Sequence, residues 1–325
     1  MILLDSFFFI SGLCLLFFGA GWLVKGSSDL AGSMGMTPLV IGLTVVAFGT
    51  SAPEMLVSVV SSFKDKSMIA VGNVVGSNIC NIGLVLGVTA LFNPVKSNAS
   101  VARREMPLML FILLYFIFLA LDSKISRLEG ITLFTGVILY TIFNYYTSKN
   151  KFSNELEKEA FKTAAAGAES VSSRSKQIFL ITAGIAGVVT GADFVVDSAV
   201  KIMKVLGVNE KFIGLTVIAF GTSLPELSTS VVAAIRNELE ISLGNLVGSN
   251  VFNILGVLGA AAIVRPVCIH GGFVESGLLI DCLVMVFISF LPILMMIKTS
   301  TISRGNGLIL LLSYSAYLGY LVYKA

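Results

Sequence analysis

The chain has 325 residues, of which 56% are hydrophobic and 13% are charged, and its mean hydropathy is +0.93. These values exclude an ordinary soluble domain and indicate an integral protein of the cell membrane that crosses the bilayer several times. The net charge of +3 is small and its basic residues are scattered, so nucleic-acid binding is not indicated. Four dispersed cysteines and one histidine predict neither a disulfide framework nor a resident cofactor.

Apolar stretches long enough for membrane helices divide the chain into two sets of five. The first five lie at about residues 7–24, 38–63, 68–92, 106–121 and 128–146. The second five lie at about residues 178–200, 212–235, 241–264, 277–297 and 307–323. The predicted fold class is therefore an all-α polytopic membrane protein with ten transmembrane helices. We expect a first repeat at 1–147, a polar linker at 148–177 and a second repeat at 178–325.

Two stretches of the first half recur in the second half at one constant offset, which makes Ile41 equivalent to Ile213. From Ile41 to Val60 against Ile213 to Val232, 15 of 20 positions are identical. Residues 72–87 match residues 244–259 at 11 of 16 positions. The chain is therefore predicted to be two copies of one unit.

Each predicted repeat has an odd number of spans, so the second repeat must enter the membrane from the side opposite to the first. Such inverted repeats place equivalent residues around a pseudo-two-fold axis near the bilayer midplane. The basic residues favour an external N-terminus, with 13 Lys and Arg in the cytoplasmic loops against 9 outside, although leaving out the linker reverses the balance to 7 against 9.

The most informative residues are Glu54 and Glu226, one in each copy of the sequence GTSxPE. An ionisable side chain within a membrane span is costly and marks an ion pathway, a proton relay or a counter-ion. The prolines before them, Pro53 and Pro225, interrupt the backbone hydrogen bonds of a helix. We therefore expect discontinuous core helices, whose free carbonyl groups can line an ion cavity.

Further oxygen-bearing side chains share helix faces with the two glutamates or lie on the companion helices. Helical spacing puts Ala47, Thr50, Ser51 and Glu54 on one face, and it does the same for Ala219, Thr222, Ser223 and Glu226. In the companion helices, the same spacing aligns Asn73, Ser77 and Asn81 on one face, and it does the same for Asn245, Ser249 and Asn253. A ligand set made only of oxygens suits hard cations, either one Ca²⁺ or several Na⁺.

The paired GTSxPE and GNxxGSNxxN motifs resemble those of the cation/Ca²⁺ exchanger superfamily, specifically its prokaryotic Na⁺/Ca²⁺ exchangers. The resemblance implies a ten-helix antiporter that exports Ca²⁺ in exchange for Na⁺ by alternating access, an activity that is electrogenic if three Na⁺ replace one Ca²⁺. It implies Ca²⁺, Na⁺ and the lipid bilayer as partners, with no obligatory protein partner.

The resemblance also implies individual roles for the matching residues. Glu54 and Glu226 would bridge Ca²⁺ with help from Thr50 and Thr222. The Na⁺ ligands would be the hydroxyl groups of Ser51, Ser77, Ser223 and Ser249 and the carbonyl groups of Ala47 and Ala219. Asn81 and Asn253 would complete the site. Several family members carry aspartate at the position of Asn253, so the Na⁺ stoichiometry and K⁺ dependence stay open.

Two other functions are compatible with parts of the pattern. A carboxylate in an apolar surrounding can exchange protons for metal ions, so an H⁺-coupled or K⁺-dependent cation antiporter is one alternative. An intramembrane hydrolase could use the two glutamates as an acid and base pair, but it would not explain the duplicated hydroxyl and amide groups. A transporter rather than an enzyme is therefore the prediction.

Overall fold

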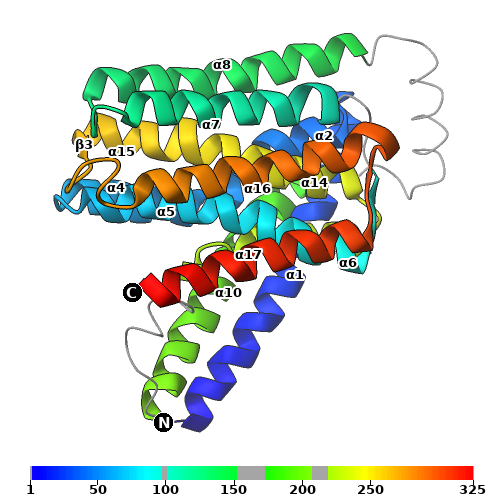
Figure 1. The fold of residues 1–325 in the computed structure, drawn as a ribbon. Coiled ribbons are helices and arrows are strands. Elements are labelled where there is room, and N and C mark those ends of the chain that lie inside the picture. Colours follow the sequence, from blue (N-terminus) through cyan, green and yellow to red (C-terminus); the bar gives the residue numbers. More distant parts are fainter. Residues whose placement is uncertain (1, 97–100, 152–172, 207–218, 325) are drawn as a thin grey trace.

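The structure is a computed structural model that describes residues 2–96, 101–151, 173–206 and 219–324. Nearly all of these residues are helical, as the composition predicted (Figure 1). Seven helices in the described residues are long and apolar enough to cross a membrane, or eight if one bent pair is counted as a single span. The prediction of an all-helical membrane protein is confirmed, whereas this count falls short of the ten predicted spans.

The two longest helices, α1 (Ile2–Met34) and α10 (Arg174–Val205), pair with each other and project from the remaining helices (Figure 1). Glycines allow their backbones to touch: a Cβ atom on Gly12 would lie 2.8 Å from the Gly191 carbonyl oxygen, and one on Gly19 would lie 2.8 Å from the Val188 nitrogen. Such small residues let membrane helices pack closely. Both helices are longer than predicted, and α10 begins inside the predicted linker.

The first repeat continues with two interrupted helical runs. The first run consists of α2 (Pro38–Ile41), the π-helix η1 (Gly42–Val46), α3 (Ala47–Thr50) and α4 (Ala52–Phe63). The second consists of α5 (Ser67–Cys80), the π-helix η2 (Asn81–Leu86) and α6 (Gly87–Phe92). The π-helix η3 (Val101–Glu105), α7 (Met106–Ala120) and α8 (Arg127–Lys151) follow.

The second repeat has a similar but not identical series of described elements after α10, because turns replace η3 before α16. Its described elements are α12 (Ala219–Gly221), α13 (Leu224–Ile235), α14 (Leu239–Phe252), the π-helix η5 (Asn253–Leu258), α15 (Gly259–Val264), α16 (Leu278–Thr299) and α17 (Arg304–Lys324). The π-helices η2 and η5 begin at equivalent positions of the two repeats, so the repeat in the sequence is also a repeat in backbone conformation.

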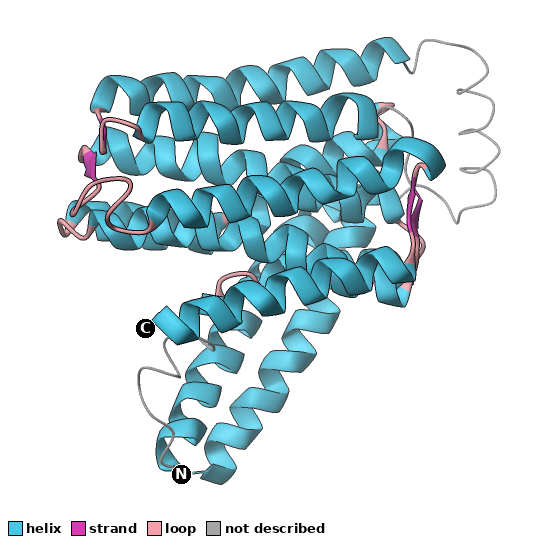
Figure 2. Ribbon diagram, in the orientation of Figure 1, coloured by secondary structure: helices cyan, strands magenta, loops and turns pink. Residues whose placement is uncertain are grey.

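Four two-residue strands join the repeats to each other at opposite ends of the helix bundle (Figure 2). At one end β1 (Val95–Lys96) pairs with β4 (Thr301–Ile302), and at the other β2 (Lys124–Ile125) pairs with β3 (Val267–Cys268). Each pair takes one strand from each repeat, and both pairs are antiparallel. The two repeats are therefore interleaved rather than side by side.

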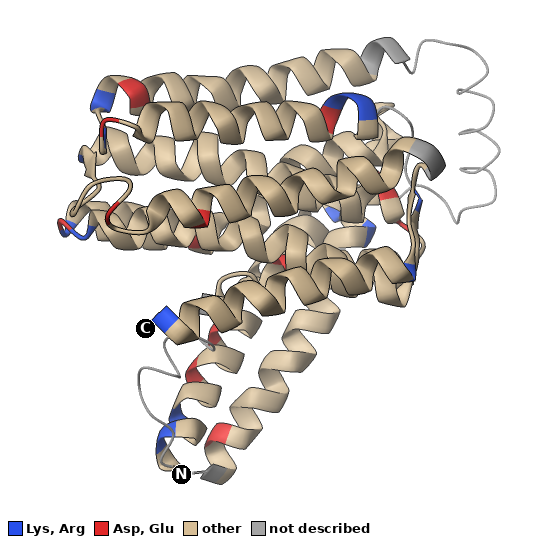
Figure 3. Ribbon diagram, in the orientation of Figure 1, with Lys and Arg blue, Asp and Glu red and all other residues tan. Residues whose placement is uncertain are grey.

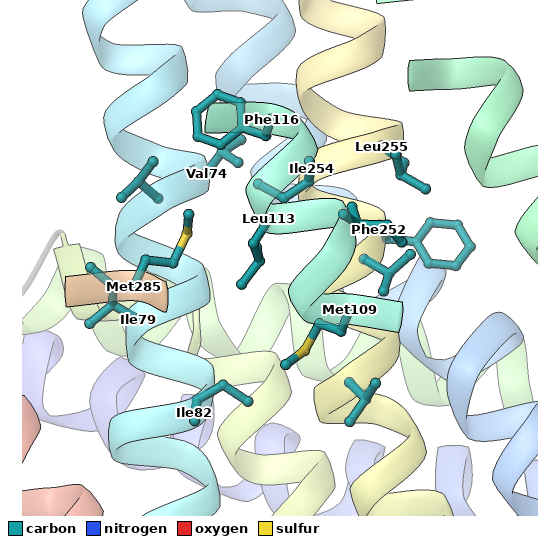
Figure 4. Close-up of a cluster of buried hydrophobic side chains, with 14 of the residues drawn as sticks. Val74, Ile79, Ile82, Met109, Leu113, Phe116, Phe252, Ile254, Leu255 and Met285 are labelled. Atoms are coloured by element: carbon teal, nitrogen blue, oxygen red, sulfur yellow. The ribbon is translucent and has the colours of Figure 1, made fainter. Parts of the chain in front are cut away.

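The apolar core lies where helices of both repeats meet (Figure 4). Leu113 and Phe116 of α7 are fully buried, as are Ile79 of α5 and Ile254 of η5. Burying a large apolar side chain contributes about 1.5–3 kcal/mol in water-soluble proteins, but between membrane helices close packing supplies most of the gain. This packing holds α5 and α14, which carry the polar residues, at the centre of the molecule.

Candidate functional site

The two glutamates of the repeated GTSxPE sequence lie in the first turns of α4 and α13. Pro53 and Pro225 occupy those first turns, where the missing N–H group of proline costs nothing because it would have no helical partner. Pro38–Thr50 and Ala52–Phe63 meet at an angle of 48°, which matches the break predicted at Pro53. Glu54 and Glu226 are both completely buried.

Most of the carboxylate oxygens lack hydrogen-bond partners among the described residues. Both oxygens of Glu54 and Oε2 of Glu226 are buried without a partner. Oε1 of Glu226 accepts a hydrogen bond of 3.3 Å from the Ser51 hydroxyl group of the other repeat. A buried polar group without a partner is costly, and an ionised carboxylate is more so, which makes this arrangement unfavourable unless a cation or proton is present.

Thr50 connects the first repeat to α14 of the second. Its hydroxyl group donates a 3.0 Å hydrogen bond to Asn245 Oδ1, and it lies 3.4 Å from the Ser249 hydroxyl oxygen. The carbonyl oxygen of Ala47 accepts the Ser51 backbone N–H at 3.0 Å and is 3.4 Å from the Thr50 hydroxyl oxygen. The structure therefore brings together several of the residues that the sequence selected, but their oxygens also bond to one another.

Asn81 and Asn253 stand at the points where α5 and α14 change into the π-helices η2 and η5. Both side chains are completely buried, and the Oδ1 atom of each has no hydrogen-bond partner among the described residues. Single π-helical turns within α-helices are frequent at functional sites. These two amide oxygens resemble the glutamate oxygens in being buried acceptors without donors.

The remaining predicted site residues differ from one another in burial. Ser77 and Ser223 are buried, whereas Thr222 is partly exposed. Ala219 opens α12 directly after residues 207–218, which lie outside the described part of the chain. The equivalence of the two repeats therefore holds at the asparagines, whereas the hydrogen bonds of the glutamates and the burial of the hydroxyl groups differ between the repeats.

The sequence analysis missed two asparagines that bond directly to the predicted ligands. Asn81 Nδ2 donates to Asn250 Oδ1, and Asn253 Nδ2 donates to Asn78 Oδ1, both at 3.1 Å. Asn78 and Asn250 occupy equivalent positions in the two copies of the GSN triplet. Their occurrence in both repeats could have identified them as site residues, but they do not share the helix faces on which the predicted ligands lie.

No group of three or more His, Cys, Asp or Glu side chains comes together in the part of the chain that the structure describes. The site consists instead of two carboxylates with neutral hydroxyl and amide oxygens around them. Lys and Arg residues lie mostly towards the ends of the helices (Figure 3). The negative charge of the buried pair is therefore without a cationic side chain in hydrogen-bonding contact among the described residues.

Three comparisons with known proteins agree with this arrangement. The family described as sodium/calcium exchanger protein matches residues 5–146 and 176–323. The sodium/calcium exchanger MaX1 of Methanosarcina acetivorans is 32% identical over an alignment 353 positions long, which covers 99% of this chain and 100% of the relative. The membrane protein MJ0091 of Methanocaldococcus jannaschii is 35% identical over 317 residues, with 97% of each chain covered.

A solved structure of the sodium-calcium exchanger NCX_Mj, soaked with 2.5 mM Na⁺ and 0.1 mM Ca²⁺, has a TM-score of 0.82 and 32% identity to this chain. The match covers 98% of this chain and 99% of that one. The likeness thus extends over nearly the whole length of the chain and includes both repeats. The chain belongs to the sodium/calcium exchanger protein family.

Proposed function

We propose that this protein is a Na⁺/Ca²⁺ antiporter of the cell membrane that exports Ca²⁺ in exchange for Na⁺ by alternating access. Members of the sodium/calcium exchanger family are transporters and not enzymes, and the printed names of the relatives support the choice of ions. The observation that carries the proposal is the cluster of buried oxygens without donors: both oxygens of Glu54, one of Glu226 and the amide oxygens of Asn81 and Asn253.

The chemistry of these oxygens supports a hard cation as the transported substrate. Ca²⁺ accepts six to eight oxygen ligands in flexible geometry at about 2.3–2.6 Å, and two carboxylates balance its charge. Mg²⁺ requires a more rigid octahedron and retains water, and thiolate or imidazole ligands, which softer metals prefer, are missing from the proposed set. The same oxygens could hold several Na⁺ instead of one Ca²⁺.

In the proposed site, Glu54 and Glu226 bridge Ca²⁺ with Thr50 and Thr222 beside them. Ser51, Ser77, Ser223 and Ser249 serve Na⁺ with the carbonyl groups of Ala47 and Ala219, while Asn81 and Asn253 contribute neutral oxygens. The 3.3 Å hydrogen bond from Ser51 to Glu226 supports this assignment, because it puts a proposed Na⁺ ligand of one repeat beside a proposed Ca²⁺ ligand of the other.

We also propose ten spans in two inverted repeats, separated by the polar linker. Seven of these spans would be the long apolar helices, and the eighth would be the bent pair of Pro38–Thr50 and Ala52–Phe63. The remaining two would contain η3 with α7, and α12 with α13. Tight turns support the inversion: Asp65 and Asn237 both have a φ of 61°, and they occupy equivalent positions of the two repeats. Asp65 forms an ion pair with Arg265 next to β3, whereas Asn237 bonds to Asn93 next to β1. The equivalent turns are thus associated with opposite strand pairs.

Flux into proteoliposomes tests the proposed function directly. An outward Na⁺ gradient should drive Ca²⁺ uptake, and imposed K⁺ or H⁺ gradients of the same size should not. Uptake driven by H⁺ alone, or uptake that requires K⁺, would replace Na⁺ coupling with the corresponding alternative. Absence of Ca²⁺ movement under every gradient would contradict the proposal.

A further inference from the structure

Four asparagines from the two repeats form a crossed hydrogen-bond network between α5–η2 and α14–η5. Asn81 Nδ2 donates to Asn250 Oδ1 at 3.1 Å, and Asn253 Nδ2 donates to Asn78 Oδ1 at 3.1 Å. Asn78 Nδ2 also donates to the Asn250 carbonyl oxygen at 3.3 Å, and Asn250 Nδ2 lies 3.5 Å from the Asn78 carbonyl oxygen. All four side chains are completely buried.

The network obeys the two-fold relation between the repeats. Asn78 and Asn81 of the first repeat correspond to Asn250 and Asn253 of the second at the same offset that relates Ile41 to Ile213. Each bond therefore has an equivalent bond with the roles of the repeats exchanged. Nothing in helix packing alone requires an amide pair to cross between α5 and α14 twice, since small apolar residues would pack there as well.

These hydrogen bonds determine which atom of the Asn81 and Asn253 side-chain amides, the inner amides of the network, is left without a partner. An asparagine side chain has an accepting oxygen and a donating nitrogen at nearly the same distance from Cβ, so it can present either by rotating. Because the nitrogen atoms of Asn81 and Asn253 are held by acceptors of the opposite repeat, their oxygens are the groups left free. Both of these oxygens are buried without a donor.

We propose that Asn78 and Asn250 are positioning residues that hold Asn253 and Asn81 as cation acceptors, each acting on the repeat opposite to its own. The inference rests on the proposed function, since it assumes that the inner amide oxygens bind Ca²⁺ or Na⁺. Outer residues that orient metal ligands typically contribute about 10–100-fold to metal affinity. Asn78 and Asn250 would do so here without touching the ion.

The crossed hydrogen bonds allow a test that distinguishes a positioning role of Asn78 from a general packing role. An aspartate at position 253 presents an oxygen in either orientation, so it no longer needs Asn78 to direct it. In Asn253→Asp, the second carboxylate oxygen would also take the place of the nitrogen that donates to Asn78 Oδ1, so two acceptors would face each other. Removing Asn78 should therefore cost Ca²⁺ affinity when residue 253 is asparagine and cost little when it is aspartate. Asn250 acts on Asn81, so it should matter equally in both backgrounds.

The experiment compares Asn78→Ala and Asn250→Ala, each with and without Asn253→Asp, in the full-length protein. Calorimetry with CaCl₂ gives the Ca²⁺ dissociation constant of each purified variant, and Na⁺-driven flux gives the half-saturating Ca²⁺ concentration and the maximal rate. We expect Asn78→Ala to weaken Ca²⁺ binding roughly 10-fold in the Asn253 background, with a smaller effect on the maximal rate. In the Asn253→Asp background only Asn250→Ala should retain its full effect.

Several outcomes would overturn the inference. Equal losses from Asn78→Ala in the two backgrounds would indicate a packing role only, and unchanged Ca²⁺ binding would indicate no role. If Asn78→Ala does not fold, Asn78→Leu removes the same acceptor while filling the space, and the same comparison applies. A wild-type protein that binds Ca²⁺ but does not exchange it for Na⁺ would contradict the proposed function, while the crossed dependence would still be decided by calorimetry.

Discussion

Glu54 and Glu226 lie in nearly identical sequences, yet their side chains have different surroundings. Glu226 accepts a hydrogen bond from Ser51, whereas neither oxygen of Glu54 has a partner among the described residues. The difference means that the two repeats are not in the same local conformation. In a protein with inverted repeats, such asymmetry is what distinguishes the side on which a central site is open from the side on which it is closed.

At the scale of the residue, Glu54→Gln and Glu226→Gln should each abolish Ca²⁺ transport. Either change removes half of the formal charge that offsets Ca²⁺ dehydration while nearly preserving the shape of the side chain. Ca²⁺ uptake into proteoliposomes under a Na⁺ gradient is the measurement.

Glu275→Gln is the matched control, because this glutamate is exposed in the loop before α16 and should transport as the wild type does. Size-exclusion chromatography should show that all three variants are folded. Wild-type flux in either site variant would remove that glutamate from the proposed site.

At the scale of the element, the position of α14 depends on close backbone contact with α2 and η1. A Cβ atom on Gly244 would lie 2.5 Å from the Leu39 carbonyl oxygen, and one on Gly248 would lie 2.6 Å from the Leu43 carbonyl oxygen. Such contact is possible only without side chains at these positions. It brings Asn245 and Ser249, which neighbour the two glycines on α14, close to Thr50.

Gly248→Ala should therefore reduce stability and transport together. The added methyl group cannot be accommodated by a flexible side chain, because the obstacle is backbone, and overpacking of this kind costs typically about 1–3 kcal/mol. Thermal unfolding in detergent and Na⁺-driven Ca²⁺ flux are the two measurements.

Gly319→Ala on α17 provides the control, since a Cβ atom there meets nothing within 4 Å. It should leave both quantities unchanged or raise stability slightly, because alanine favours helix more than glycine does. Full stability of Gly248→Ala would show that η1 and α14 can separate without cost.

At the scale of the whole molecule, the interleaved strand pairs tie the two repeats together at both ends of the bundle (Figure 2). The paired helices α1 and α10 project away from the other helices and reach them mainly near one end of the pair (Figure 1). One part of the molecule is thus cross-linked by β1 with β4 and β2 with β3. The other part, α1 with α10, reaches it mainly near one end, which suits relative movement of the two parts during the proposed alternating access.

Inverted topology predicts that Asp65 and Asn237 lie on opposite sides of the membrane. In a background with the four native cysteines replaced by alanine, Asp65→Cys and Asn237→Cys should react with a membrane-impermeant maleimide from opposite sides. Both positions are turn residues, so the substitutions leave the helices intact. Labelling of both cysteines from the same side would contradict the inverted repeats, and the side on which each reacts gives the orientation of the protein.

Exchange should also be electrogenic if three Na⁺ replace one Ca²⁺. Ca²⁺ neutralises the two glutamates, whereas three Na⁺ would leave the site at +1, a charge that the membrane potential moves with about 2.3 kcal/mol per 100 mV. Because Asn253 is uncharged, the third Na⁺ has only these two carboxylates to balance it. Clamping the voltage with K⁺ and valinomycin should change the Na⁺-driven Ca²⁺ flux, once K⁺ transport itself has been excluded. Flux that is independent of voltage would instead indicate two Na⁺ for each Ca²⁺.

The sequence by itself determined the membrane class, the repeat and the two glutamates, because these depend on composition, offset and local helix chemistry. Pro53 predicts its own helix break, since the proline ring restricts the backbone wherever it stands. The same local argument did not give the lengths of α1 and α10, because polar residues near their ends, such as Asp5 and Lys201, interrupt the apolar runs from which the spans were predicted.

Only the tertiary structure decided which polar groups bond to each other. The pairing of Asn78 with Asn253 joins residues 175 positions apart, and helical periodicity describes neighbours within one helix only. The sequence also contained no sign of the π-helices at Asn81 and Asn253, since a change from α to π hydrogen bonding depends on contacts from other helices. Which oxygens remain free for an ion follows from those contacts and not from the identity of the residues alone.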